Sequence, residues 1–330
     1  MGREHRISER TRLEAVPQTT RRGAALRMQA ADGMGLGGQM WRHAGPSRMR
    51  PVVVIAPATS VHSRYYGRFA EYLFEQGFDV LTFDYRGIGL SRPPSLRGFR
   101  ADWVDWGEKD LDAALRHAEA ECPGQPLHVV AHSIGGFAIG LAPANARIRR
   151  IVTVGAQYAH WRDYDRAARA RMIVKWHLGM PALTALFGYF PARRLGWMED
   201  TPAGVVRDWS RMAARFEDSV RPRQFVAGAR EADLLVQRFS QVTAPILAIG
   251  LDDDPHGTPE AIRRLLAYFT ASPWRHWHVM PSDIGAVSIG HFAFFHDRFR
   301  ETLWPLALAW LREAESPEAP PGRLLVRALR

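Results

Sequence analysis

The sequence predicts an α/β protein: a mostly parallel, doubly wound sheet with a helical cap inserted into it. Short runs of β-branched residues alternate with segments whose apolar residues recur at helical spacing, which is typical of this fold class. The alternation stops between about residues 157 and 243, where we expect several helices and no strand. One strand also runs directly into a serine and a glycine-rich helix start at 131–136.

Each element is predicted from its local pattern. The run VVVIA at 52–56 is continuously apolar, as expected for a strand buried on both faces. The segment 63–76 has helical spacing and ends before Gly77. The remaining strands are expected at 24–31, 38–43, 80–83, 127–131, 151–154, 246–249 and 277–280, and further helices at 102–120 and 134–141.

The domain boundaries follow from the same patterns. The first segment, 1–23, is basic and expected to be flexible. The α/β core comprises 24–156 and 244–314, and the helical cap spans 157–243. Residues 315–330 form the C-terminal tail: 315–322 is a polar, proline-rich linker, and we expect the last residues to fray.

Composition bounds the class of protein. The 330 residues are 46% hydrophobic and 24% charged, which excludes disordered, collagen-like and coiled-coil chains. The single cysteine, Cys122, excludes an internal disulfide framework and favours a reducing, cytoplasmic location. We found neither a secretory signal nor an apolar run of membrane-spanning length, so no stable membrane insertion is expected.

The net charge of +10 is unevenly distributed, because residues 1–50 hold ten arginines and four acidic residues. Basic residues are not interleaved with aromatic ones, and zinc-finger spacing is missing, so nucleic acid is not an expected partner. The segment 158–240 contains fourteen basic and nine acidic residues. This excess would suit an anionic group on a small-molecule substrate.

The segment AHSIGG predicts a catalytic serine at position 133. A buried strand that turns sharply into a glycine-rich helix is the context of a nucleophile elbow. The residues two before and two after the serine must be small, and they are Ala131 and Gly135. A plain strand–turn–helix with an incidental serine is the alternative.

A serine hydroxyl needs a base, and the base needs an acid that orients it. The acid is expected after the strand at 246–249, where three aspartates follow one another. We select Asp253, with Asp254 as the substitute. The base is assigned to His291, which follows the last predicted strand by a loop.

The oxyanion hole is expected to use backbone N–H groups of Ile134 and Thr59, the latter in the loop after VVVIA. Aromatic residues of the cap are expected to bind substrate, foremost Tyr158, Trp161 and Trp176. No metal site is predicted, because the paired histidines at 276 and 278 have no third ligand nearby.

Together these segments resemble the alpha/beta-hydrolase superfamily in order and spacing over roughly residues 50–311. The matching motifs are IAPAT, FDYRGIGLS, AHSIGG, the aspartate loop and GHF. The chain also resembles a narrower bacterial branch of serine aminopeptidase-like and lysophospholipase-like hydrolases, through RYYGRFA, GYFPARRLG and IGHFAFF. Two departures stand out: Pro57-Ala58 replaces a common His-Gly, and Ala131 replaces the first elbow glycine.

The resemblance implies a Ser-His-Asp hydrolase without a cofactor. We therefore expect a carboxylic ester hydrolase, or one acting on a thioester or amide, that cleaves a small or acyl-chain substrate through an acyl-enzyme. An acyltransferase using the same triad and a non-catalytic binding protein on this fold are the alternatives.

Overall fold

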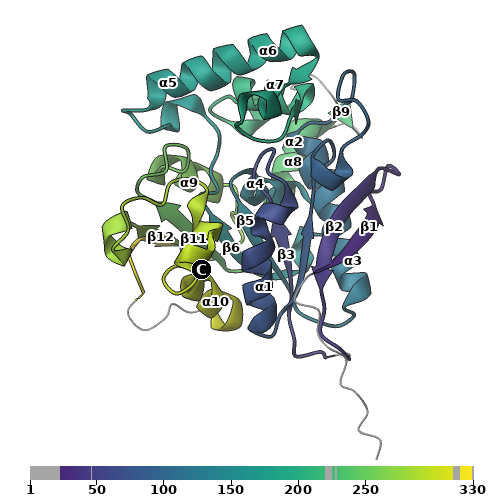
Figure 1. Ribbon diagram of the computed structural model, residues 1–330, viewed down its shortest axis with the longest axis vertical. Coiled ribbons are helices and arrows are strands. Elements are labelled where there is room, and N and C mark those ends of the chain that lie inside the picture. Colours follow the sequence, from purple (N-terminus) through teal and green to yellow (C-terminus); the bar gives the residue numbers. More distant parts are fainter. Residues whose placement is uncertain (1–22, 46, 220–224, 227–228, 315–319, 329–330) are drawn as a thin grey trace, which may run out of the picture.

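A nine-stranded sheet runs through the part of the chain that the structure, a computed structural model, describes: residues 23–45, 47–219, 225–226, 229–314 and 320–328 (Figure 1). The strand order is β1-β2-β4-β3-β5-β6-β11-β12-β13. Neighbours from β4 to β12 are parallel, and the pairs β1–β2, β2–β4 and β12–β13 are antiparallel. The mostly parallel α/β sheet is thereby confirmed.

The sheet strands are β1 (Ala24–Gln29), β2 (Gly35–Trp41), β3 (Val52–Ala56), β4 (Asp79–Phe83), β5 (Leu127–His132), β6 (Ile148–Val154), β11 (Ile246–Leu251), β12 (Trp274–Val279) and β13 (Arg323–Ala328). The α-helices are α1 (Gly67–Glu75), α2 (Trp103–Asp105), α3 (Asp112–Glu121), α4 (Ile134–Leu141), α5 (Arg169–Ile173), α6 (Met180–Phe187), α7 (Ala203–Arg211), α8 (Glu231–Phe239), α9 (Pro259–Leu266) and α10 (Trp304–Glu313). The π-helical segments η3 (Trp106–Leu111) and η6 (Val174–Gly179) join α2 to α3 and α5 to α6. Short 3₁₀ turns are η1 (Ser63–Tyr66), η2 (Gly89–Ser91), η4 (Asn145–Arg147), η5 (Trp161–Asp163), η7 (Ala192–Leu195), η8 (Phe216–Asp218), η9 (Pro281–Ile284), η10 (Ala293–Phe295) and η11 (Asp297–Phe299).

The central strands are apolar throughout because both faces of the sheet are covered. In β3, the side chains of Val52 and Val54 belong to one hydrophobic core, and those of Val53 and Ile55 belong to the other. The first core includes residues of α3, α4 and α8, and the second includes residues of α1 and α10. A doubly wound sheet explains why the sequence pattern was continuous rather than alternating.

The end of the chain corrects one prediction. Residues 323–328 form β13 and pair antiparallel with β12, rather than fraying. The indole N–H of Trp277 also donates to the carbonyl of Pro321 at 2.7 Å. A strand that pairs with an open sheet edge satisfies backbone N–H and C=O groups there. The polar composition of the preceding linker gives no indication of this pairing. Residues 315–319, and the predicted basic segment except Gly23, lie outside the described residues.

The insertion between β6 and β11 has two parts. The helices α5, α6 and α7 lie together at one end of the molecule, above the sheet (Figure 1). In contrast, α8 packs beside the sheet against α4, where the ring of Phe239 occupies the space next to Gly140. The expectation of no strand is wrong in detail, because two-residue pairs form between β7 (Tyr189–Phe190) and β8 (Thr201–Pro202), and between β9 (Phe225–Val226) and β10 (Ala229–Arg230).

Candidate active site

Ser133 lies at the sharp turn between β5 and α4. Its backbone has φ 55° and ψ −121°, a conformation that a non-glycine residue adopts only where the surroundings impose it. A side chain at Gly135 would place its Cβ 2.5 Å from the carbonyl oxygen of Ala56 at the end of β3. The small residue that the sequence pattern required at this position is therefore explained by contact with the neighbouring strand.

The acid that contacts His291 is Asp254. Its Oδ2 lies 2.7 Å from His291 Nδ1, and the Asp254 side chain is fully buried. The choice of Asp253 is wrong in this respect, because its carboxylate instead accepts the backbone N–H groups of Ile289 and Gly290, each at 2.8 Å. Both aspartates thus act on the His291 loop, one through the ring and one through the backbone.

The protonation state of this pair follows from its surroundings. Burial alone would raise the pKa of Asp254, but the charge and hydrogen bond of His291, the neighbouring His256 ring and the backbone N–H of Gly257 lower it to about 2. An ionised carboxylate can only accept, so His291 Nδ1 carries a proton, and in the neutral form of the ring Nε2 presents a lone pair. Gly155 and Gly257 leave the space for this contact, since a Cβ on either would come within 2.8 Å of Asp254 Oδ2.

Ser133 and His291 line the same cavity of about 350 Å³. The side-chain amide of Gln157 donates to Ser133 Oγ, with Nε2 3.5 Å away. Among the described residues, Ser133 Oγ makes no direct hydrogen bond to His291. Such bonds are often long without substrate and shorten only in the reacting complex.

Ile134 and Thr59, the residues expected to form the oxyanion hole, both line this cavity. Ile134 is the first residue of α4, so its N–H has no acceptor within the helix. Neither this N–H nor that of Thr59 has a hydrogen-bond partner among the residues that the structure describes. The N–H of Ala58, by contrast, donates to the hydroxyl of Tyr66 at 2.8 Å, which excludes Ala58 as a second donor.

The loop that carries Thr59 is held in place from both sides. Ser60 has a left-handed backbone (φ 57°), its Oγ lies 2.7 Å from Thr201 Oγ1, and its carbonyl accepts the N–H of Glu199. Buried Asp84 accepts the N–H groups of Ser63 and Leu90. The insertion and the segment after β4 therefore fix the loop together.

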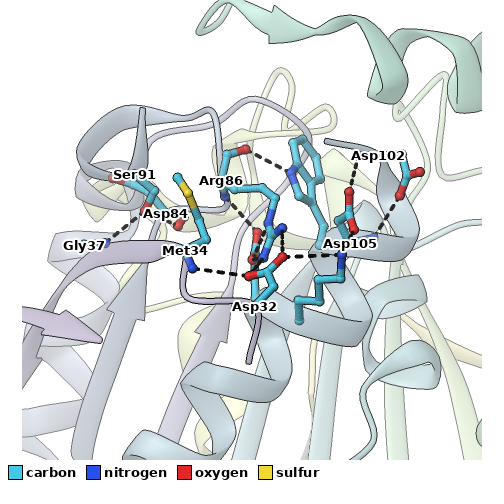
Figure 2. A network of polar contacts seen from close by, with 11 residues as sticks. Asp32, Met34, Gly37, Asp84, Arg86, Ser91, Asp102 and Asp105 are labelled. Atoms are coloured by element: carbon cyan, nitrogen blue, oxygen red, sulfur yellow. Dashed lines mark hydrogen bonds and ion pairs between the residues drawn. The ribbon is translucent and has the colours of Figure 1, made fainter. Parts of the chain in front are cut away.

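Arg86, two residues after Asp84, anchors that segment to the body of the protein (Figure 2). Its guanidinium contacts the carboxylates of Asp32 and Asp110, each at 2.7 Å, and its carbonyl accepts the indole N–H of Trp106. The guanidinium holds the pKa of Asp32 well below its usual range, whereas burial raises the pKa of Asp110. The motif DYRG thus forms a structural support and supplies no reacting group.

The site cavity has an aromatic wall. Its described lining residues are Ala58, Thr59, Trp103, Ser133, Ile134, Gln157, Ala159, Lys175, Trp176, Gly196, Trp197, Met198, Trp209, His256, His291 and Phe292. Trp176 is where the sequence placed it, and its ring stacks on Trp209 at 4.6 Å. Tyr158 and Trp161 are not among these residues: Tyr158, four residues after β6, is buried in the core and its ring stacks on that of Tyr268.

Sequence reasoning missed three residues of this lining that bear on its chemistry: Gln157, Lys175 and His256. Gln157 follows β6 by three residues, a position where α/β sheets present polar groups. His256 follows the aspartate loop, and its ring centroid lies 4.9 Å from that of His291. Burial lowers the pKa of His256 to about 3, so it is neutral near pH 7.

Two further searches concern the described residues only. No group of three or more His, Cys, Asp or Glu side chains in them is arranged to hold a metal ion. Likewise, none of their helices combines the length and hydropathy needed to cross a membrane.

The strand order, the elbow and the helices above the sheet define an alpha/beta hydrolase. Comparison of sequences then places the chain more closely: it belongs to the serine aminopeptidase S33 family, whose profile matches residues 47–276. This is a family of serine-type hydrolases. A search of curated protein sequences finds no significant match.

Solved structures with the same fold are distant in sequence. A soluble variant of monoglyceride lipase from Saccharomyces cerevisiae is 14% identical with a TM-score of 0.62, over 91% of this chain and 98% of that one. An esterase from Pyrococcus furiosus is 12% identical with a TM-score of 0.53, over 89% and 91%. Mouse alpha/beta hydrolase domain-containing protein 10 is 12% identical with a TM-score of 0.52, over 88% and 100%. At these identities the similarity establishes the fold alone.

Proposed function

We propose that the protein is a carboxylic ester hydrolase in which Ser133, His291 and Asp254 form the catalytic triad. The observation that carries the proposal is the contact between His291 and ionised Asp254, beside a strained serine in one cavity. The substrate is a small-molecule ester whose apolar part contacts the tryptophans of the cavity wall. The helices α5 to α7 act as a cap over this cavity.

The reaction follows from the proton positions. His291 Nε2 accepts the proton of Ser133 Oγ as that oxygen bonds to the ester carbonyl carbon. The carbonyl oxygen becomes an oxyanion and accepts N–H groups from Ile134 and Thr59, each worth about 3–4 kcal/mol in the transition state. The C–O bond of the ester then breaks, and the alcohol leaves with the proton from His291.

Water completes the cycle. His291 removes a proton from a water molecule, whose oxygen attacks the acyl carbon bound to Ser133. The bond to Ser133 Oγ breaks, the oxygen recovers its proton from His291, and the free acid leaves. Asp254 stabilises the protonated ring in both halves.

The test pairs activity with labelling of the serine. Purified protein is assayed on 4-nitrophenyl esters of increasing acyl length and treated with a fluorophosphonate probe. We expect hydrolysis and probe labelling, and loss of both in Ser133→Ala, with kcat lower by orders of magnitude. Unchanged turnover in a clean Ser133→Ala preparation would overturn the proposal, as would wild-type protein that neither turns over esters nor reacts with the probe.

A further inference from the structure

Lys175 is unusual among the charged residues of this chain. Of 44 basic residues only Lys109 and Lys175 are lysines, and Lys109 forms an ion pair with Asp105 at 2.6 Å. Lys175 lines the site cavity, and no carboxylate of the described residues pairs with it. Among the described lining residues it is the one lysine or arginine, and none is aspartate or glutamate.

Two tryptophans hold the Lys175 ammonium at the cavity wall. Its Nζ lies 4.2 Å from the ring centroid of Trp176 and 3.9 Å from that of Trp197. Contacts with ring faces offset part of the cost of removing a cation from water. These ring contacts do not neutralise the ammonium as a carboxylate would. Its charge therefore remains available to a ligand in the cavity.

Two arginines of the same region, by contrast, form ion pairs. Arg92 pairs with Asp200 at 2.9 Å, and Arg215 pairs with Glu217 at 2.6 Å. A half-buried cation without a counter-charge is costly, because neither water nor a carboxylate fully compensates it. Burial and neighbouring Arg171 accordingly lower the pKa of Lys175. A negatively charged ligand would remove this cost.

We propose that Lys175 binds an anionic group of the substrate, a carboxylate or phosphate carried on the ester. This rests on the proposed function, and it names the substrate class of the same site. A lysine suits the role because its compact charge and three rotatable donors accommodate anionic oxygens in several geometries. The location of Lys175 near the triad also fits this role. Besides burial, the Lys175 charge lowers the pKa of His256, whose ring lies next to that of His291.

The test compares matched esters with and without the charge. On the acyl side, 4-nitrophenyl hydrogen adipate is compared with its methyl ester. On the alcohol side, 3-(butyryloxy)benzoate and 3-(butyryloxy)phenyl phosphate are compared with methyl 3-(butyryloxy)benzoate. The variants are Lys175→Met, Lys175→Arg and, as a control for general surface charge away from the cavity, exposed Arg149→Gln.

We expect the wild type to prefer at least one anionic ester over its neutral partner. Lys175→Met should lower kcat/KM for that ester about tenfold, equal to about 1.4 kcal/mol, and change neutral esters less than twofold. Lys175→Arg should retain most of the preference. The anionic ester whose kcat/KM falls in Lys175→Met shows whether the charge lies on the acyl or the alcohol side, and whether it is a carboxylate or a phosphate.

Three results would overturn the inference: no preference in the wild type, equal losses on charged and neutral esters in Lys175→Met, or an equal effect of Arg149→Gln. Failure of the proposed function is recognised separately. In that outcome neutral esters are not hydrolysed in a Ser133-dependent way, whatever the Lys175 variants do.

Discussion

Replacing each of two adjacent aspartates by asparagine tests the site most directly. Asp254 contacts the ring of His291, whereas Asp253 contacts only the backbone of the His291 loop. Asparagine is nearly the same size as aspartate, so both variants keep the packing and change charge and hydrogen bonding alone. Each variant therefore controls for the other.

The expected magnitudes differ widely. The pKa of about 2 for Asp254, against an ordinary 3.8, means that the fold favours its ionised form by about 2 kcal/mol. In Asp254→Asn this anion is lost, and the amide can force the proton of His291 onto Nε2, where it blocks base catalysis. A wrong tautomer of this kind lowers kcat on the order of 10⁴-fold in serine proteases.

Asp253→Asn should be mild. The asparagine carbonyl keeps one of the two N–H bonds, and Asp253 is solvent-exposed. Losing the other bond should cost about 1–2 kcal/mol of stability and less than tenfold in kcat.

The assay measures kcat and kcat/KM on 4-nitrophenyl butyrate, the rate of fluorophosphonate labelling, and urea unfolding for both variants. Active-site titration of the wild type sets the detection limit for trace contamination. The reasoning is refuted if Asp253→Asn loses more activity than Asp254→Asn while both remain folded. Equal losses within a factor of three would refute it as well.

Further variants test the supports of the site. Arg86→Met should lower the free energy of unfolding, measured in urea, by about 3–5 kcal/mol, because Asp110 is left buried without its ion pair. Adding Asp110→Asn should recover part of this loss. Equal stability of the single and the double variant would contradict the role of the ion pair. Burial lowers the pKa of His128 to about 4, below the value of the unfolded chain, so the unfolded state binds the proton first and stability falls as pH drops from about 6.5 towards 4. His128→Met should therefore flatten the pH dependence of urea unfolding by about 1.4 kcal/mol per pH unit in that window, and an unchanged slope would count against it. Gly135→Ala should abolish esterase activity, whereas Gly67→Ala, with open space around it, should retain it; a fully active Gly135→Ala protein would disprove the tight elbow.

The sheet could be predicted because each central strand carries its own signal. Uninterrupted β-branched runs such as 52–56 occur where helices cover both faces, and those strands lie close to their expected positions. The strand at 323–328 could not be predicted, since its stability comes from pairing with β12 and not from its own composition. The π-helical segments were missed for a similar reason: helical spacing does not distinguish them from an α-helix.

The sequence predicted which loops form the candidate site, but it did not predict where the individual side chains in these loops point. Ser133 and His291 each follow a strand in a distinctive local pattern, and they line one cavity. Between Asp253 and Asp254 the sequence offers no such guide, because the loop has left the alternation of β11 and the nearest neighbours are distant in the chain. Lys175 could not be singled out from the sequence either. Its proposed role depends on contacts with two tryptophans and on its having no carboxylate partner among the described residues.

His132 shows how a side chain beside the nucleophile connects the two halves of the site. His132 directly precedes Ser133 at the end of β5, and adjacent strand residues point to opposite faces. In the structure its Nε2 lies 2.8 Å from the carbonyl of His291, which can only accept, so Nε2 carries the proton and Nδ1 accepts the hydroxyl of Tyr66. Burial lowers the pKa of His132 to about 3, which keeps this arrangement neutral. Because Tyr66 also receives the N–H of Ala58, one buried chain of hydrogen bonds joins the loop of Thr59 to the loop of His291. The loops that carry Thr59 and His291 are therefore positioned by a common support, and a change to any member of this chain of hydrogen bonds should affect both.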